Sequence, residues 1–366
     1  MFSSTTTVST LFFSNKFLNH DTGSPVDQNK TSCVLHLANM TTIPQTPPNK
    51  LLFTRPRHAP DSHTSNTRAK YLIFFIPGNP GIIQYYSVFL KNLHEKLAHG
   101  LKPRVDVLGI TLAGFECGAS EHQDVRNKAK KFPLSIDDQI DFVERTLRDY
   151  TEPDTRIILM GHSFGVYIFM EMLRRRQSRL KTTGHVIGAI GLFPGVVHLA
   201  RSQGGRRGQQ WLAIPGLAFL LIWLARALGL LLPTKILQNV IRALSGYPDH
   251  AVRTTVHWIR SRWGLQQSLH LVREELIRIT DDAWDDEVWG TDIHMLFGEK
   301  DVYVPEIERD ALISARAVKS AVQTGSTPYF EIAATGIPHD FSIRHNAPVA
   351  EKVDIWVRKI ISQDEA

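Results

Sequence analysis

Apolar and polar residues follow an alternation of strand and helix patterns from Tyr71 onward. Residues 71–76 form an unbroken apolar run that ends at Pro77-Gly78, as expected of a strand buried on both faces. The same kind of pattern predicts further strands at residues 105–110, 156–160, 186–193, 293–297 and 329–332. Helical spacing of apolar residues predicts helices at residues 86–97, 136–147, from 166 onward, 307–322 and 349–361. This order favours an α/β domain over residues 70–366, with a mostly parallel sheet and helices on both faces.

Helical patterns alone occupy residues 194–291, between two of the predicted strands. We expect this block to be a helical cap inserted into the α/β domain. Residues 211–232 within it form a very apolar segment.

The first 69 residues have a different composition, rich in Ser, Thr, Asn and Pro. Such a stretch cannot bury enough apolar surface to offset the entropy lost on ordering. We predict a largely disordered extension over residues 1–69.

Composition and charge narrow the function classes. Of 366 residues, 43% are hydrophobic and 21% are charged, which is typical of a globular protein. The net charge of +6 comes from local clusters, such as Arg174 to Arg176, without a nucleic-acid-binding signature, so no nucleic-acid partner is expected. The two cysteines, Cys33 and Cys117, lack the spacing of a metal site. A disulfide scaffold and a zinc site are not expected, and a reducing compartment is the default.

A candidate nucleophile lies between the strand at 156–160 and the helix that follows it. Gly161-His-Ser163-Phe-Gly165 fits the G-x-S-x-G nucleophile elbow of an α/β-hydrolase fold. The turn is so tight that Gly161 and Gly165 must lack side chains, which leaves Ser163 exposed above the sheet. The competing interpretation is an ordinary strand-to-helix turn capped by a serine. His162 is expected to pack or hydrogen bond within the elbow and not to act as the base.

Candidates for the acid and the base follow later strands, in the chain order Ser, Asp, His that this fold requires. Asp301 lies in the turn after residues 293–297, and His339 lies in the loop after residues 329–332. A base must reach the serine because a hydroxyl at its free pKa is a poor nucleophile. Glu299 and Asp292 are weaker candidates for the acid, and His345 is the alternative base.

The loop Pro77-Gly-Asn-Pro-Gly81 is expected to supply one oxyanion donor, opposite the amide of Phe164. Pro80 has no N–H. The amide of Asn79 is therefore the first candidate and that of Gly81 the second, with a purely structural turn as the competing interpretation.

Taken together, these residues resemble the lipid droplet-associated hydrolase family over roughly residues 70–361. The resemblance rests on Phe75 to Gly81 with Tyr85, Tyr86 and Phe89, on Gly161 to Gly165, on Gly298 to Asp301, on His339 to Phe341, and on Leu269 to Ile279. It implies an α/β-hydrolase with Ser163, Asp301 and His339 as its triad. It further implies lipid esters, such as sterol esters or acylglycerols, as substrates. It places the protein at the cytosolic face of lipid droplets and the endoplasmic reticulum.

The apolar segment 211–232 is long enough to raise the question of a membrane-spanning helix. A single crossing would put Ser163 and Asp301 on opposite sides of the membrane, so we discard it. Two alternatives stay open: a buried helix of the cap, or a monotopic element that dips into a lipid surface. The second is favoured, with Trp211, Phe219 and Trp223 as lipid-surface residues.

Three functions fit these features. The first is a serine ester hydrolase that acts on lipid esters and needs no cofactor or metal. The second is a droplet-binding scaffold with a vestigial hydrolase body. The third is an acyltransferase that uses the same triad.

Overall fold

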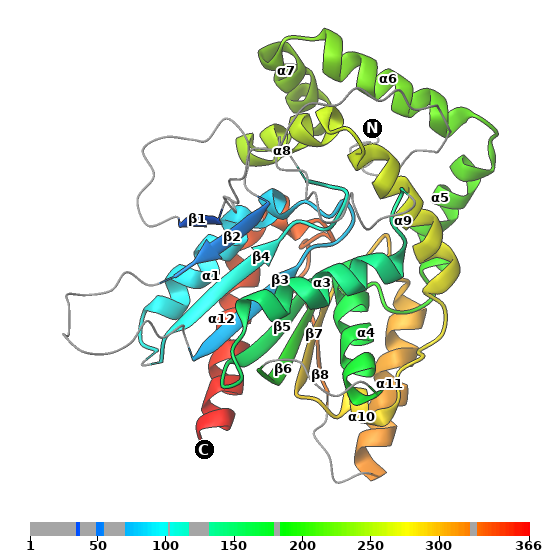
Figure 1. Ribbon diagram of the computed structural model, residues 1–366. Coiled ribbons are helices and arrows are strands. Elements are labelled where there is room, and N and C mark those ends of the chain that lie inside the picture. Colours follow the sequence, from blue (N-terminus) through cyan, green and yellow to red (C-terminus); the bar gives the residue numbers. More distant parts are fainter. Residues whose placement is uncertain are drawn as a thin grey trace.

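The computed structural model describes residues 34–36, 49–54, 70–101, 103–116, 132–178, 184–322 and 328–366. In this part of the chain one sheet has the order β1-β2-β4-β3-β5-β6-β7-β8 (Figure 1). The strands are β1 (Val34–His36), β2 (Lys50–Phe53), β3 (Tyr71–Ile76), β4 (Val105–Ile110), β5 (Arg156–His162), β6 (His185–Leu192), β7 (Ile293–Phe297) and β8 (Tyr329–Ile332). Only β2 and β4 pair antiparallel among them. The predicted mostly parallel sheet is confirmed.

The centre of the sheet is covered by helices on both faces. β3 and β4 are buried at every position, as the unbroken apolar run of β3 predicts, although β4 also buries Asp106. α1 (Ser87–Ala98) and α12 (Asn346–Glu365) lie together on one face, and α3 (Ile136–Tyr150) and α4 (Phe164–Ser178) on the other (Figure 1). α11 (Glu306–Val322) connects β7 to β8.

The helix at residues 86–97 was predicted one residue too early. The 3₁₀ turn η1 (Ile83–Tyr86) comes first, and α1 begins at Ser87. The final helix, predicted over 349–361, is longer at both ends and spans Asn346–Glu365.

β2 corrects the prediction of disorder for part of the N-terminal extension. Lys50–Phe53 pairs with β4, and Leu51 and Phe53 are buried in the main core. Four residues with two apolar side chains on one face are too short a signal to stand out beside the Pro-rich sequence around them. Residues 1–33, 37–48 and 55–69 lie outside the described residues.

Helices alone occupy the chain between β6 and β7, as the pattern predicts. They are η2 (Leu199–Arg201), α5 (Gln203–Ala213), α6 (Leu217–Leu231), α7 (Thr234–Ser245), α8 (Asp249–Arg260), α9 (Gly264–Arg278) and α10 (Asp286–Trp289). α5 to α9 lie beyond the carboxyl ends of the strands, with α6 and α7 furthest from the sheet (Figure 1).

The apolar segment 211–232 is not one helix. α5 ends at Ala213, and α6 begins after Gly216, whose φ of 74° requires glycine at the corner. Among the described helices none alone is long and apolar enough to cross a membrane. α5 and α6 meet that requirement only as a pair, and the chain bends by 95° between them.

Candidate active site

Ser163 lies on a sharp turn between β5 and α4. Its φ of 52° is left-handed, a strained conformation for a residue with a side chain. A Cβ on Gly165 would lie 2.2 Å from the carbonyl oxygen of Ile76, and one on Gly161 would lie 2.6 Å from the backbone of Gly165. The two glycines therefore let the chain close tightly enough to present the serine at the end of β5.

His339 and Asp301 meet Ser163 from two loops far away in the sequence. The Nε2 atom of His339 lies 2.9 Å from Oγ of Ser163, and its Nδ1 atom lies 2.8 Å from Oδ2 of Asp301. Because the carboxylate only accepts, Nδ1 carries the proton and Nε2 is left to accept from the serine hydroxyl. The structure thus brings the three predicted residues into one hydrogen-bonded line.

Asp301 is held in its ionised form. Its Oδ1 atom accepts from the amides of Tyr303 and Val304, at 2.8 and 3.3 Å. Burial raises the pKa of Asp301, but His339 and these amides outweigh burial, so that the pKa lies below its ordinary value. The carboxylate can therefore orient the ring and stabilise an imidazolium.

His162 connects the elbow to the loop that carries His339. Its Nδ1 atom lies 2.8 Å from the hydroxyl of Tyr86, and its Nε2 atom lies 2.8 Å from the carbonyl oxygen of His339. The Tyr86 hydroxyl in turn accepts from the amide of Gly78 at 3.2 Å. A hydrogen-bonded chain thus runs from the loop after β3, through the elbow, to the backbone of the candidate base.

The two side chains in this hydrogen-bonded chain, Tyr86 and His162, are uncharged. Burial and the nearby His339 lower the pKa of His162 to about 3, and burial raises the pKa of Tyr86. His162 therefore donates through Nε2 and accepts through Nδ1 at ordinary pH. The sequence predicted that His162 packs or hydrogen bonds within the elbow, but its partners Tyr86 and His339 lie outside it, on separate elements.

The oxyanion candidates differ in their placement. Phe164 is the first residue of α4, so its amide has no partner within the helix and lies beside Ser163. Asn79 lines the cavity in front of Ser163, whereas Gly81 is not among the residues that line it. The Gly81 carbonyl accepts from Leu112 instead, and a Cβ there would meet the Leu112 side chain at 2.5 Å. Of the two candidates in this loop only Asn79 lines the cavity, so Phe164 and Asn79 are the donors that we propose below.

The alternative acids and base make other contacts. Asp292 binds His294 at 3.1 Å, at the start of β7, and the Glu299 carbonyl accepts from Arg309. His345 lines the cavity, but His339 is the histidine bonded to Ser163. Within the described residues no group of three His, Cys, Asp or Glu side chains is placed to hold a metal ion.

A cavity of about 690 Å³ opens beside Ser163 and His339. Such a volume is typical of small-molecule sites. Leu199, Val272 and Leu276 supply apolar wall on the cap side, and Tyr86 and Ile343 supply it on the core side. The cavity can hold an apolar group next to the serine.

The three predicted lipid-surface residues lie elsewhere, on the outer part of the cap. Trp211, Phe219 and Trp223 are 39%, 45% and 63% exposed, and none of them lines the cavity. Ala218, Ile222 and Gly229 of α6 are buried, so one face of the helix packs while the other is open. A helix buried on all sides, one of the two alternatives, is not what the structure shows.

Known proteins are similar to this chain in sequence and in fold. The sequence model of the family described as "Lipid-droplet associated hydrolase" matches residues 69–342. A lipid droplet-associated hydrolase of Mus musculus is 24% identical over 301 residues, which cover 80% of this chain and 86% of the mouse protein. One from Dictyostelium discoideum is 23% identical over 311 residues, which cover 80% and 89%.

A solved structure supports the fold independently of the sequence. The peroxisomal α/β-hydrolase Lpx1 of Saccharomyces cerevisiae superposes with a TM-score of 0.52 at 13% identity, covering 82% of this chain and 78% of that one. The chain has an α/β-hydrolase fold, and it belongs to the lipid-droplet associated hydrolase family.

Proposed function

We propose that the protein is a serine ester hydrolase that cleaves lipid esters at the surface of a lipid droplet. The observation that carries the proposal is the line from Asp301 through His339 to Ser163, which ends in the wall of a partly apolar cavity. Membership of a hydrolase family and relatives named for the lipid droplet agree with it. Sterol esters and acylglycerols are the substrate classes we expect.

The proposed reaction follows from the geometry. Ser163 attacks the ester carbonyl while His339 takes its proton through Nε2. The amides of Phe164 and Asn79 stabilise the oxyanion, and Asp301 stabilises the imidazolium. His339 then protonates the leaving alcohol, and water, activated by the same ring, releases the acyl group from the serine.

Labelling with a fluorophosphonate probe tests whether Ser163 is activated. We expect the wild type to become labelled and Ser163→Ala to remain unlabelled. Ser342, a second serine that lines the cavity, offers a control. Ser342→Ala should label like the wild type. An unlabelled wild type would instead support the scaffold function, because that function needs no reactive serine.

The outer face of α6 and α7 is suited to a lipid monolayer. Leu230 and Leu231 are 77% and 80% exposed at the end of α6, and Ile236, Val240 and Leu244 extend the apolar face along α7. Arg206 and Arg207, exposed on the neighbouring α5, can meet anionic head groups at about 1 kcal/mol each. A monolayer over an apolar core can accept such a face from one side, without a spanning helix.

The same face reaches the cavity. Leu244 is 67% exposed and also lines the cavity, together with Ser245, the last residue of α7, and residues 246–247 after it. We propose that an apolar substrate passes from the lipid to the serine along this end of α7.

Substitutions on α6 should separate lipid binding from chemistry. Trp223→Glu combined with Leu230→Glu and Leu231→Glu is expected to weaken binding to phospholipid-coated triolein droplets at least about 100-fold, because each buried apolar side chain contributes roughly 1.5–3 kcal/mol. Flotation measures the binding. Hydrolysis of a soluble short-chain ester should not change.

Ile307→Glu is the matched control, because Ile307 is an equally exposed apolar residue on α11, at 82%. It should leave droplet binding intact. Equal binding by the triple variant and the wild type would show that another surface contacts the lipid.

A further inference from the structure

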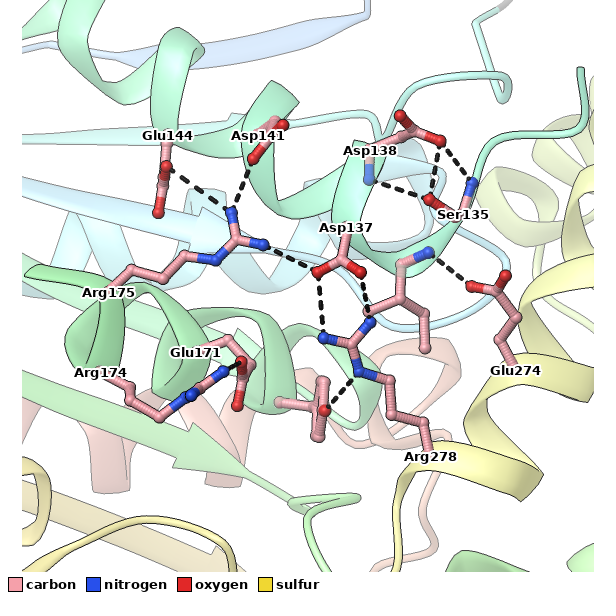
Figure 2. A network of polar contacts seen from close by, with 12 residues as sticks. Ser135, Asp137, Asp138, Asp141, Glu144, Glu171, Arg174, Arg175, Glu274 and Arg278 are labelled. Atoms are coloured by element: carbon pink, nitrogen blue, oxygen red, sulfur yellow. Dashed lines mark hydrogen bonds and ion pairs between the residues drawn. The ribbon is translucent and has the colours of Figure 1, made fainter. Parts of the chain in front are cut away.

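α9 is the cap helix that is tied most directly to the hydrolase body by polar contacts. Arg278 donates to both carboxylate oxygens of Asp137 at the start of α3, at 2.7 and 3.0 Å, and Asp137 also binds Arg175 of α4 (Figure 2). Glu274 accepts from the amide of Ile136 at 2.6 Å (Figure 2). Gln267 bonds both the amide and the carbonyl of Leu134. These contacts fix α9 relative to the sheet and hence to the elbow.

A neighbouring face of α9 holds the loop of the oxyanion candidate. The side-chain nitrogen of Asn79 donates to the Ser268 carbonyl and to Oε1 of Glu275, each at 2.9 Å. Both hydrogens of this amide group are therefore used by one helix of the cap. The backbone amide of Asn79, proposed above as an oxyanion donor, is positioned by a side chain clamped to α9.

Glu275 is an unusual residue for this place. It is 6% exposed and lines the cavity next to Asn79, and no ion pair of its side chain is found in the described part of the chain. Burial raises the pKa of Glu275 to about 8, partly offset by the hydrogen bond from Asn79. The carboxyl group is therefore neutral at ordinary pH.

Few charges face Glu275 from the elements packed against α9. α5, η2 and α8 present Gly205, Gly208, Leu199 and Trp258 to the cavity, and Asp137 of α3 is bound by Arg278. The titratable or charged residues that share the cavity with Glu275 are Tyr85, Tyr86, His162, Tyr247, Tyr303, His339, Asp340, Arg344 and His345. Of these, Tyr86 and His162 do not titrate near pH 8, since their pKa values are displaced far from it.

We propose that Glu275 is a positioning residue for the reaction, which ties the Asn79 side chain to α9 and so places the oxyanion amide. The proposal rests on the hydrolase function proposed above. When Glu275 ionises, its charge lies beside the site where the ester oxygen becomes negative. A like charge there destabilises the transition state, so the ionised enzyme should be slow.

The pH profile of kcat tests the proposal, with p-nitrophenyl butyrate as substrate and Ser163→Ala as the blank at each pH. The wild-type kcat should fall above about pH 8, by up to about 10-fold per pH unit. Glu275→Gln keeps the acceptor oxygen and cannot ionise, so its kcat should stay level over this range. Glu275→Ala should show a lower kcat than the wild type below about pH 8, with a smaller change in KM, because Asn79 loses one of its two partners.

Glu274→Gln is the matched control, since Glu274 is the adjacent carboxylate and points to α3 instead (Figure 2). It should keep the wild-type decline. An alkaline decline that persists in Glu275→Gln, or an unchanged kcat in Glu275→Ala, would overturn this inference alone. A wild type no faster than Ser163→Ala would overturn the hydrolase function and this inference with it.

Discussion

Ser163→Ala is expected to lower kcat for a soluble short-chain ester by about 10⁶-fold, which is the loss seen when a triad acts as a unit. The nucleophile is removed, while His339 and Asp301 keep their own contact. Steady-state kinetics on a chromogenic ester, after subtraction of the buffer rate, measures the loss.

The melting temperature serves as the control for this variant. The fold should persist, because the change removes one oxygen at a position whose left-handed φ of 52° is disfavoured for serine and alanine alike. Residual turnover within 10-fold of the wild type, with an unchanged melting temperature, would exclude Ser163 as the nucleophile.

Asp301→Asn is expected to lower kcat by about 10⁴-fold, the size of effect known for a triad with the wrong histidine tautomer. The amides of Tyr303 and Val304 donate to Oδ1, so an asparagine must keep its oxygen there and turn its NH₂ towards His339. Nδ1 would then accept, and Nε2 would carry the proton and could no longer take one from Ser163. The same substrate and a ring-proton NMR experiment on His339 report the rate and the tautomer.

Glu299→Gln is the control for the aspartate, because it removes a carboxylate in the same turn without touching the triad. It should retain wild-type kcat. Comparable losses of kcat in the two variants would mean that the conformation of the turn, and not the Asp301 carboxylate bonded to His339, determines the rate.

Features that depend on a few neighbouring residues could be predicted from the sequence, and features that depend on distant residues could not. The strands at 71–76 and 293–297 were predicted at their observed bounds, because an unbroken apolar run is a local signal. The elbow was predictable for the same reason: its two glycines and the serine lie within five residues. For Asp301 and His339 the sequence supplied only position after a strand. Their meeting with Ser163 depends on the order of strands in the sheet.

Side-chain contacts between distant elements could not be predicted from the pattern of apolar and polar residues. Tyr86 and His162 are 76 residues apart, and Asn79 and Glu275 are 196 apart. The segment around Glu275 contributed to the family resemblance and to the predicted cap, but Glu275 was given no role, because a glutamate on a helix ordinarily faces solvent. The prediction of disorder was wrong at β2, because Leu51 and Phe53 become buried only when β2 pairs with β4.

The span that matches the family, residues 69–342, is shorter than the body that folds. β2 lies before it and protects the edge of β4, while α12 lies after it and buries Val353, Trp356 and Ile360. The Asp364 carboxylate, near the end of α12, also accepts from the Tyr71 hydroxyl of β3 at 3.0 Å. A truncated chain reduced to the family match would expose a bare sheet edge and an apolar trough, both of which invite aggregation. The span that matches the family and the folded body therefore have different borders in this protein.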